Sequence, residues 1–450
     1  MKPVPVIAIF DVGKTNKKLF LFDEHYRIVF ERTARFLETT DEDGEPCENL
    51  ESLRLSIFDS LREVFRMPEF EIRAINFSTY GASLVYVDNQ GTPIAPLYSY
   101  LKPYPEYLKQ QFYATYGGES KVAEQTASPI LGSLNSGMQL YRLKYEQPDV
   151  FKKLKYALHL PQYLSSLISG IASSEITSIG CHTGLWDFGR SAYHKWVKEE
   201  GLLDKMAPLV PSTEVHSACF PGNNYAVGAG LHDSSAALIP YLANFTEPFV
   251  LLSTGTWCIS MNPFNDSVLT EEELNQDCLC YLQYGGKPVK ASRVFSGYEH
   301  EQQEKRIIAH FKEEKSRYKD LELDEEVIAK LRKSKPAKPE FSSRNLADFD
   351  TGAEAYHQLM LDLVEKQLQS TNLVLAGTPV KRIFVDGGFS KNAIFMHLLA
   401  SAYPEIEVFA ASMAQATAVG TALAIHHAWN TKPLPTDLIE LKYYSNARFV

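Results

Sequence analysis

The sequence predicts an α/β protein of two domains that hold a ligand in a cleft between them. Two similar hairpin patterns, at residues 7–23 and 248–261, lie in separate halves of the 450-residue chain and indicate an internal duplication. A strand, a glycine pair and a helical pattern follow at 382–403. Because 450 residues exceed the usual size of one hydrophobic core, we expect two domains and predict them at 1–240 and 241–450.

The first hairpin, IAIFDVGKTNKKLFLFD, runs from Ile7 to Asp23 and has apolar strands on either side of a turn at Gly13. A glycine turn lets backbone N–H groups face one concavity, and the lysines beside it add positive charge, so a polyphosphate fits there. Asp11 stands beside the turn and can hold the cation that accompanies such an anion. Taken alone, the same residues also fit an ordinary hairpin with a solvated basic turn.

Two further elements offer loops of the same kind. PFVLLSTGTWCISM, at 248–261, is a hairpin with a small-residue turn around Gly255, although many strand turns have this composition. The strand Arg382–Val385 precedes DGGFSKN and a helical pattern. Bare backbone at a glycine pair permits close approach, and a helix N-terminus attracts anions, so this element suits a nucleotide or phosphate. Its alternative is a strand-to-helix loop that needs glycines only for its turn.

Composition limits the partners. The net charge of −10 and the isoelectric point of 5.7 argue against nucleic acid and against an anionic membrane surface. No apolar segment approaches the length that spans a bilayer. Cys278 and Cys280 lack a second pair at zinc-site spacing, so we expect reduced thiols and a cytoplasmic protein. A homodimer is left open.

Read in order, these segments resemble the FGGY carbohydrate kinases of the actin-like ATPase superfamily over nearly the whole chain. Asp11–Lys18 resembles the first phosphate motif of that family, Ser253–Trp257 the second, and Asp386–Asn392 the adenosine motif. GLHDSSA, at 230–236, resembles the segment of the catalytic aspartate, and residues 76–98 resemble the segment that reads the sugar. The resemblance implies two actin-like (ribonuclease H-like) domains with a nucleotide cleft between them, and an ATP-dependent sugar kinase that uses Mg²⁺.

The resemblance also implies roles for single residues. Asp233 becomes the catalytic residue that accepts a proton from a sugar hydroxyl, and Asp11 and Asp233 become the carboxylates that face Mg²⁺. As an alternative, Asp233 simply caps the helix DSSAALIPYL, and His232 is a packing residue. The residues expected to contact ATP are Gly13, Thr15, Lys18, Thr254, Gly255, Thr256, Gly387, Gly388, Ser390 and Asn392. The residues expected to contact the sugar are Thr79, Tyr80, Gly81, Ala82, His232 and Asp233.

Three departures from the family pattern bear on the substrate. Lys14 stands where the family has a small or hydroxyl residue, and it either adds a phosphate contact or points outward. Gln415 occupies a position where related kinases often carry glutamate. Tyr98–Lys102 replaces a common tryptophan, aspartate and arginine run with aromatic residues, which favour a sugar bearing a methyl group. We therefore expect a deoxy-ketohexose such as L-rhamnulose or L-fuculose, with a ketopentose such as L-ribulose or xylulose as the alternative.

Two other functions remain open at this point. The chain can be a catalytically silent sugar or nucleotide sensor, or an ATPase that uses water as the acceptor. The remaining predictions concern helices: a core helix over 352–375, a small-residue helix over 416–428 near the nucleotide, and a solvent-facing helix over 313–335 within the charged span 299–338, for which a disordered insert is the alternative.

Overall fold

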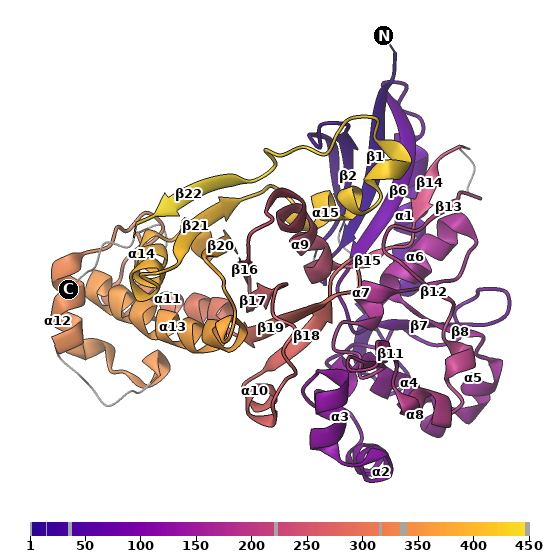
Figure 1. The fold of residues 1–450 in the computed structure, drawn as a ribbon, viewed down its shortest axis with the longest axis horizontal. Helices are drawn as coiled ribbons and strands as arrows, with labels where there is room; N and C mark the ends of the chain where they lie inside the picture. The colour runs from indigo at the N-terminus through magenta and orange to yellow at the C-terminus, as the bar shows by residue number, and fades with distance from the viewer. Residues whose placement is uncertain are drawn as a thin grey trace.

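The chain folds into two seven-stranded mixed sheets, one from each half of the sequence, as the computed structural model in Figure 1 shows. The structure describes residues 2–14, 16–34, 38–219, 224–314, 317–333 and 340–445. Thr15, which the sequence assigned to ATP, lies outside the described residues.

The first sheet is built around the predicted N-terminal hairpin. Strand β1 (Val4–Val12) pairs antiparallel with β2 (Lys17–Asp23) and parallel with β6 (Phe70–Thr79). The side chains of Ile7 and Phe20 are fully buried, because helices or loops cover both faces of the sheet. Its strand order is β13 (Val215–Ser217), β14 (Ala226–Gly228), β6, β1, β2 and β3 (Ile28–Ala34), and β15 (Leu231–His232) pairs with the end of β6.

The second sheet repeats this plan. Strand β16 (Phe249–Thr254) pairs antiparallel with β17 (Cys258–Asn262) and parallel with β20 (Arg382–Gly387), as β1 does with β2 and β6. The strand order is β18 (Cys278–Leu282), β19 (Pro288–Val294), β17, β16, β20, β21 (Glu407–Ser412) and β22 (Glu440–Tyr444). The two predicted hairpins are thus confirmed as equivalent elements of two similar sheets.

Four two-stranded sheets or pairs lie outside these main sheets. Strand β7 (Leu84–Val87), which follows β6, leaves the first sheet and pairs with β8 (Tyr156–His159). The others join β4 (Glu38–Thr40) to β5 (Pro46–Glu48), β9 (Ser174–Glu175) to β12 (Leu209–Val210), and β10 (Trp186–Asp187) to β11 (Ala192–Tyr193).

The helices of the first half are α1 (Leu50–Val64), α2 (Glu106–Tyr116), α3 (Glu119–Thr126), α4 (Ser136–Glu146), α5 (Pro148–Lys153), α6 (Leu160–Ser169), α7 (Ile176–Ile179) and α8 (Lys195–Glu199). Those that follow are α9 (Asp233–Asn244), α10 (Glu271–Asn275), α11 (Ser296–Phe311), α12 (Glu325–Lys333), α13 (Gly352–Leu375), α14 (Ala393–Ala402), α15 (Ala416–Ala424) and α16 (His426–Trp429). The predicted core helix over 352–375 is confirmed as α13. Of the solvent-facing helix predicted over 313–335, only Glu325–Lys333 is helical, as α12; residues 315–316 and 334–335 lie outside the described residues. No helix in the described part of the chain is long and apolar enough to cross a membrane.

Helices α9 and α15 pack against each other between the two sheets (Figure 1). The absence of a side chain on Gly420 permits this close approach, since a Cβ atom there would lie only 1.9 Å from the carbonyl oxygen of Ala236. Asn76 of β6 adds a hydrogen bond to the carbonyl oxygen of Thr421, at 3.0 Å. The small-residue helix predicted over 416–428 is α15, which ends earlier, at Ala424. Its contacts with α9 and β6 join the two halves of the chain. The predicted boundary between residues 240 and 241 falls within α9.

Candidate active site

Two carboxylates meet at the end of strand β6. Asp11 lies near the end of β1, opposite Ser78 of β6, whose hydroxyl donates to the Asp11 carboxylate at 3.1 Å. Asp233 follows β15, which pairs with the last two residues of β6. Burial, and secondly the negative charge of Asp233, raise the pKa of Asp11 to about 6, while the hydrogen bond from Ser78 and the positive charge of Lys18 act in the opposite direction. The charge of Asp233 thus acts on Asp11, as expected of two carboxylates that lie near each other.

Asp233 is the first residue of α9, and the N-cap is His232. The Asp233 carboxylate accepts a hydrogen bond from the backbone N–H of the next residue, Ser234, at 2.7 Å, and not from the deeper N–H groups that an N-cap side chain satisfies. Burial raises the pKa of Asp233 to about 6, although its side chain keeps 35% of its surface exposed. The carboxylate is thus reachable and poised to exchange a proton near neutral pH.

His232 lies behind this carboxylate. Its Nε2 atom is 3.1 Å from Oδ1 of Asp233 and 3.0 Å from Sγ of Cys181. Burial lowers the pKa of His232 to about 3, so the imidazole is neutral at physiological pH. The ring of Tyr281, from β18 of the second sheet, lies 5.5 Å from the imidazole ring. Both halves of the chain therefore enclose the histidine that touches Asp233.

The segment Thr79–Ala82, expected to contact the sugar, borders the same place. A Cβ atom on Gly81 would lie 2.8 Å from Sγ of Cys181 and 3.1 Å from the imidazole of His232. The hydroxyl of Thr79 is buried and donates to the carbonyl of Tyr80. Ala82 has a φ of 59°, which is unusual for a residue with a Cβ atom, and its carbonyl accepts a hydrogen bond from Gln139 at 2.7 Å. The turn is therefore held rigidly against His232.

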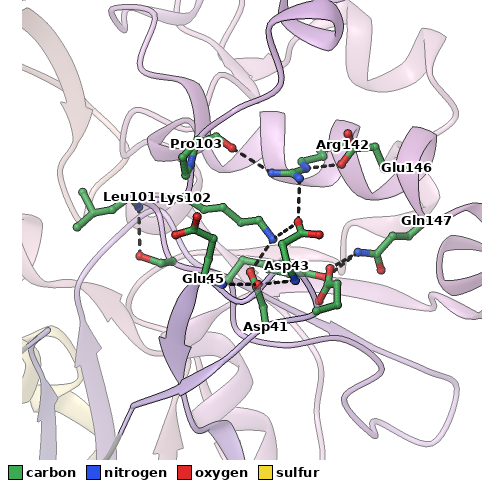
Figure 2. Close-up of polar contacts among 12 residues, drawn as sticks. Asp41, Asp43, Glu45, Leu101, Lys102, Pro103, Arg142, Glu146 and Gln147 are labelled. Carbon is green, nitrogen blue, oxygen red and sulfur yellow. Dashed lines mark hydrogen bonds and ion pairs between the residues drawn. The ribbon is translucent and has the colours of Figure 1, made fainter.

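The segment Tyr98–Lys102, in which aromatic residues replace the family's polar run, is tied down by buried charges. Figure 2 shows the ammonium group of Lys102 between Asp41 and Asp43, at 2.5 and 2.8 Å. Arg142 of α4 contacts Asp43 at 3.2 Å from the other side. The hydroxyl of Tyr98 donates to Glu42 at 2.6 Å, whereas Tyr100 places its ring 6.0 Å from that of Tyr80. Of the two tyrosines in this segment, Tyr100 is the one that packs against the predicted sugar segment.

The lysines of the first turn point in different directions. Lys18 lies 3.0 Å from Glu31, and its charge acts on Asp11. Lys14 points neither outward nor toward Glu31: its Nζ atom lies 3.5 Å from Oε1 of Glu48 and 5.4 Å from the ring centroids of Tyr80 and Tyr100.

In the second sheet, Thr254 joins the loop after β16 to the loop after β20. Its hydroxyl donates to the carbonyl of Asp386 at 2.6 Å and accepts from the N–H of Phe389 at 3.0 Å. Gly387 has a φ of +93°, and a Cβ atom there would lie 2.0 Å from the carbonyl oxygen of Thr254. The N–H of Gly388 donates to that same oxygen at 2.8 Å. The second phosphate motif and the adenosine motif therefore form one backbone surface, beside which Gly255 and Thr256 are exposed.

Two other residues assigned to ATP have structural partners. Asn392 caps α14 by accepting from the N–H of Phe395, and its amide donates to the hydroxyl of Tyr356 at 2.8 Å. Ser390 is buried and donates to the carbonyl of Gly387 at 2.8 Å. Both side chains therefore stabilise the conformation of the loop 386–392, which resembles the adenosine motif.

The residues fit a magnesium ion held largely by phosphate and water. Among the described residues, no group of three or more histidine, cysteine, aspartate or glutamate side chains forms a complete metal site. Mg²⁺ is commonly bound through one or two carboxylates plus substrate phosphates, which matches Asp11 and Asp233. A cation between them would also offset the repulsion that raises the pKa of Asp11.

Several residues of this site were not singled out from the sequence. Cys181, Tyr281 and Glu48 reach the site only through tertiary packing, and no local pattern marks them. Gly297, by contrast, lies where the sequence pattern changes from strand to helix: it follows β19 and is the second residue of α11. A Cβ atom on Gly297 would lie 1.8 Å from the carbonyl oxygen of Gly255, so α11 starts against the second phosphate motif. A glycine between a strand pattern and a helical pattern indicates a close backbone approach, so the sequence could have identified this residue.

Comparison with known families matches both halves of the chain. Residues 6–239 match the N-terminal domain of the FGGY family of carbohydrate kinases, and residues 246–433 match the C-terminal domain of carbohydrate kinase FGGY. The chain is 24% identical over 290 residues to a rhamnulokinase from Mannheimia succiniciproducens, a match that covers 59% of this chain and 57% of the relative. A rhamnulokinase from Halalkalibacterium halodurans is 23% identical over 278 residues, covering 55% and 52%. The chain thus spans little more than half the length of these curated relatives.

Solved structures share the whole fold. A carbohydrate kinase from Novosphingobium aromaticivorans superposes with a TM-score of 0.82 at 24% identity, covering 98% of this chain and 94% of that one. A xylulose kinase from Lactobacillus acidophilus superposes with a TM-score of 0.79 at 14% identity, covering 98% and 93%. The predicted two-domain α/β fold is confirmed, and it is the fold of these sugar kinases.

Proposed function

Because this chain belongs to the FGGY family of carbohydrate kinases, we propose that it transfers the γ-phosphoryl group of ATP to a hydroxyl group of a small ketose. The observation that supports the proposal is the pair Asp11 and Asp233, two acids with a pKa of about 6 that strand pairing brings to the end of β6. Phosphoryl transfer passes through a loose transition state, so the protein mainly positions groups and offsets charge. Such a site needs one carboxylate for the acceptor and one for the cation.

Asp233 is the proposed catalytic residue. Its carboxylate accepts a hydrogen bond from the sugar hydroxyl, orients the oxygen toward the γ-phosphate, and takes the proton as the new O–P bond forms. The neutral imidazole of His232, 3.1 Å away, holds the carboxylate in place without neutralising its charge. A pKa of about 6 leaves Asp233 mostly ionised at pH 7, and still basic enough to accept a proton.

Asp11, with Asp233, is the proposed protein side of the Mg²⁺ site. The ion supplies positive charge to the β- and γ-phosphates of ATP. Gly13, Lys18, Gly255 and Thr256 are proposed to contact those phosphates, and Gly387 and Gly388 to border adenosine. Thr254, Ser390 and Asn392 support this surface through the loop contacts described above. A division into sugar-binding residues 1–240 and nucleotide-binding residues 241–450 is part of the same proposal.

For the acceptor, a deoxy-ketohexose such as L-rhamnulose or L-fuculose is the first choice. The paired rings of Tyr80 and Tyr100 suit an apolar sugar face or a methyl group. The two rhamnulokinase relatives, at 23–24% identity, support the same choice. A ketopentose such as L-ribulose or xylulose is the second candidate, favoured by the structural likeness to a xylulose kinase.

A coupled ADP-release assay with a panel of ketoses tests the proposal. We expect ADP release that depends on a ketose and on Mg²⁺, with a stoichiometric sugar phosphate as product. ADP release at the same rate without sugar would indicate an ATPase that uses water. No ADP release with any sugar, together with measurable sugar or nucleotide binding, would indicate a silent sensor.

A further inference from the structure

Lys14 belongs to the first phosphate turn by sequence but to the acceptor side by contact. It follows Gly13 between β1 and β2. Its ammonium group lies near Glu48, at the end of β5, and over the rings of Tyr80 and Tyr100. These three partners come from the hairpin β4–β5 and from the segments after β6 and β7, none of which is a phosphate loop. The neighbours of the Lys14 ammonium group therefore differ from those expected of a lysine that contacts ATP.

Glu48 explains why Lys14 is held there. Only 6% of its surface is exposed, and its carboxylate interacts with the hydroxyl of Tyr80. A buried carboxylate is unfavourable unless cations also lie close to it. Nζ of Lys17 lies 3.2 Å from one oxygen and Nζ of Lys14 lies 3.5 Å from the other. One carboxylate thus faces two ammonium groups, and it holds that of Lys14 next to the two tyrosine rings.

Tyr100 connects Lys14 to the proposed catalytic residue. Burial raises the pKa of Tyr100, and the negative charges of Asp233 and Glu48 raise it further, so this tyrosine lies within reach of both acids. The ring of Tyr100, 5.4 Å from Nζ of Lys14, is therefore a neighbour of both Lys14 and Asp233. Gly81 and Ala82, in the expected sugar segment, carry no polar side-chain atoms. Recognition of sugar oxygens must come from other residues, and Lys14 retains 28% of its side-chain surface to make such a contact.

We propose that Lys14 determines acceptor specificity: its ammonium group, positioned by Glu48 between the rings of Tyr80 and Tyr100, donates a hydrogen bond to an oxygen of the ketose. The aromatic rings then cover the apolar face of the same sugar, and they also stabilise the cation above them. The inference rests on the proposed sugar kinase activity and deepens it, because it separates Lys14 from the lysines that face ATP.

The test compares two lysines of one turn in the 450-residue chain. Lys14→Met removes the charge and keeps the length of the side chain, and Lys18→Met does the same at the proposed phosphate contact. Lys152→Met, in an exposed ion pair of α5, serves as the surface control. For each, KM is measured for the best ketose at saturating MgATP and for MgATP at saturating ketose. Ketose binding without nucleotide is measured by isothermal titration calorimetry, and folding is checked by thermal unfolding.

We expect Lys14→Met to raise KM and Kd for the ketose about tenfold to a hundredfold, as for a lost hydrogen bond to a charged donor, with KM for MgATP changed by less than about threefold. Lys18→Met should show the opposite pattern. A Lys14→Met variant that is folded but raises KM for MgATP instead, or changes neither constant, would overturn the inference while leaving the kinase proposal intact. If the unaltered chain phosphorylates no ketose, the kinase proposal fails first and the role of Lys14 falls with it.

Discussion

The Nε2 atom of His232 lies 3.1 Å from the carboxylate oxygen Oδ1 of Asp233, yet the two do not form an ion pair. Burial lowers the pKa of the histidine to about 3, so it is neutral wherever the aspartate is ionised. Nε2 also lies 3.0 Å from Sγ of Cys181, which fixes the plane of the ring. The pair is therefore an oriented, charged acceptor beside a neutral donor, which keeps the basicity of Asp233 available for a substrate proton.

Replacement of Asp233 by asparagine should abolish phosphorylation but preserve nucleotide binding. The amide keeps the shape of the side chain but cannot accept the proton, so we expect kcat to fall at least about a hundredfold. Kd for ADP, measured by titration calorimetry, should change by less than about threefold. Loss of folding in this variant would instead support a capping role for Asp233, which the hydrogen bond to Ser234 does not favour.

The rate should depend on pH with an acidic limb near pH 6. Asp233 must be ionised to accept a proton, and burial raises its pKa to about 6, so kcat/KM should fall as the pH drops through 6. The slope should approach tenfold per pH unit, and become steeper where Asp11 also takes up a proton. In His232→Gln the limb should stay at the same pH, because the histidine does not titrate there. A limb that disappears in this variant would contradict the assignment.

Elements defined by local pattern were the most predictable. The hairpin at Asp11, the second hairpin at Gly255 and the helix over 352–375 follow from apolar periodicity and glycine turns, and all three are confirmed. Asp11 and Asp233 were matched by motif, since each stands at the end of a short apolar strand. Their shared position at the end of β6 follows from strand pairing, which a single sequence does not reveal.

The surroundings of these acids could not be predicted, because they depend on contacts between distant segments. Glu48 reaches Lys14 through a two-stranded hairpin of three residues per strand, too short for a periodic signal. Cys181 reaches His232 from a loop after α7. Lys14 remained ambiguous for the same reason: a turn motif predicts the backbone, whereas the direction of a long side chain depends on the partners that packing brings to it.

Asp233→Asn should also change thermal stability in a pH-dependent way. The pKa of Asp233 rises from 3.8 to about 6 on folding, so the folded state binds this proton more tightly than the unfolded chain does. The ionised carboxylate therefore destabilises the ligand-free protein above pH 6, and this penalty declines as the pH falls from 6 toward 4. We expect the variant to melt about 1–3 °C higher than the unaltered chain at pH 8, with a difference that shrinks toward zero near pH 4. A difference that is independent of pH would exclude this origin.

Gly387 and Gly388 should differ sharply in their tolerance of a methyl group. In Gly387→Ala the new Cβ atom would lie 2.0 Å from the carbonyl oxygen of Thr254, at a φ of +93°. We expect a loss of about 2 kcal/mol or more in the free energy of unfolding, since backbone must move to relieve the clash. In Gly388→Ala the same distance is 3.8 Å, and the loss should stay below about 1 kcal/mol. Denaturant unfolding of the two variants measures both; equal losses would show that the two loops are not rigidly joined through Thr254.

Lys102→Met should destabilise the first half of the chain, since it leaves the buried carboxylate of Asp41 without its cation. The side chain of Asp41 is 1% exposed, and Lys102 lies 2.5 Å from it (Figure 2). Removing one partner of a buried ion pair typically costs about 3–5 kcal/mol, because the remaining charge is neither solvated nor paired. The matched control is Lys152→Met, whose ion pair with Asp149 is mostly exposed and should contribute less than about 1 kcal/mol.

A second variant, Lys102→Met with Asp41→Asn, should recover much of the loss measured in denaturant, because it removes the uncompensated charge. If the double variant is no more stable than Lys102→Met alone, the loss comes from the packing of the lysine stem against Tyr98, 4.8 Å from the ammonium group, and not from the stranded carboxylate.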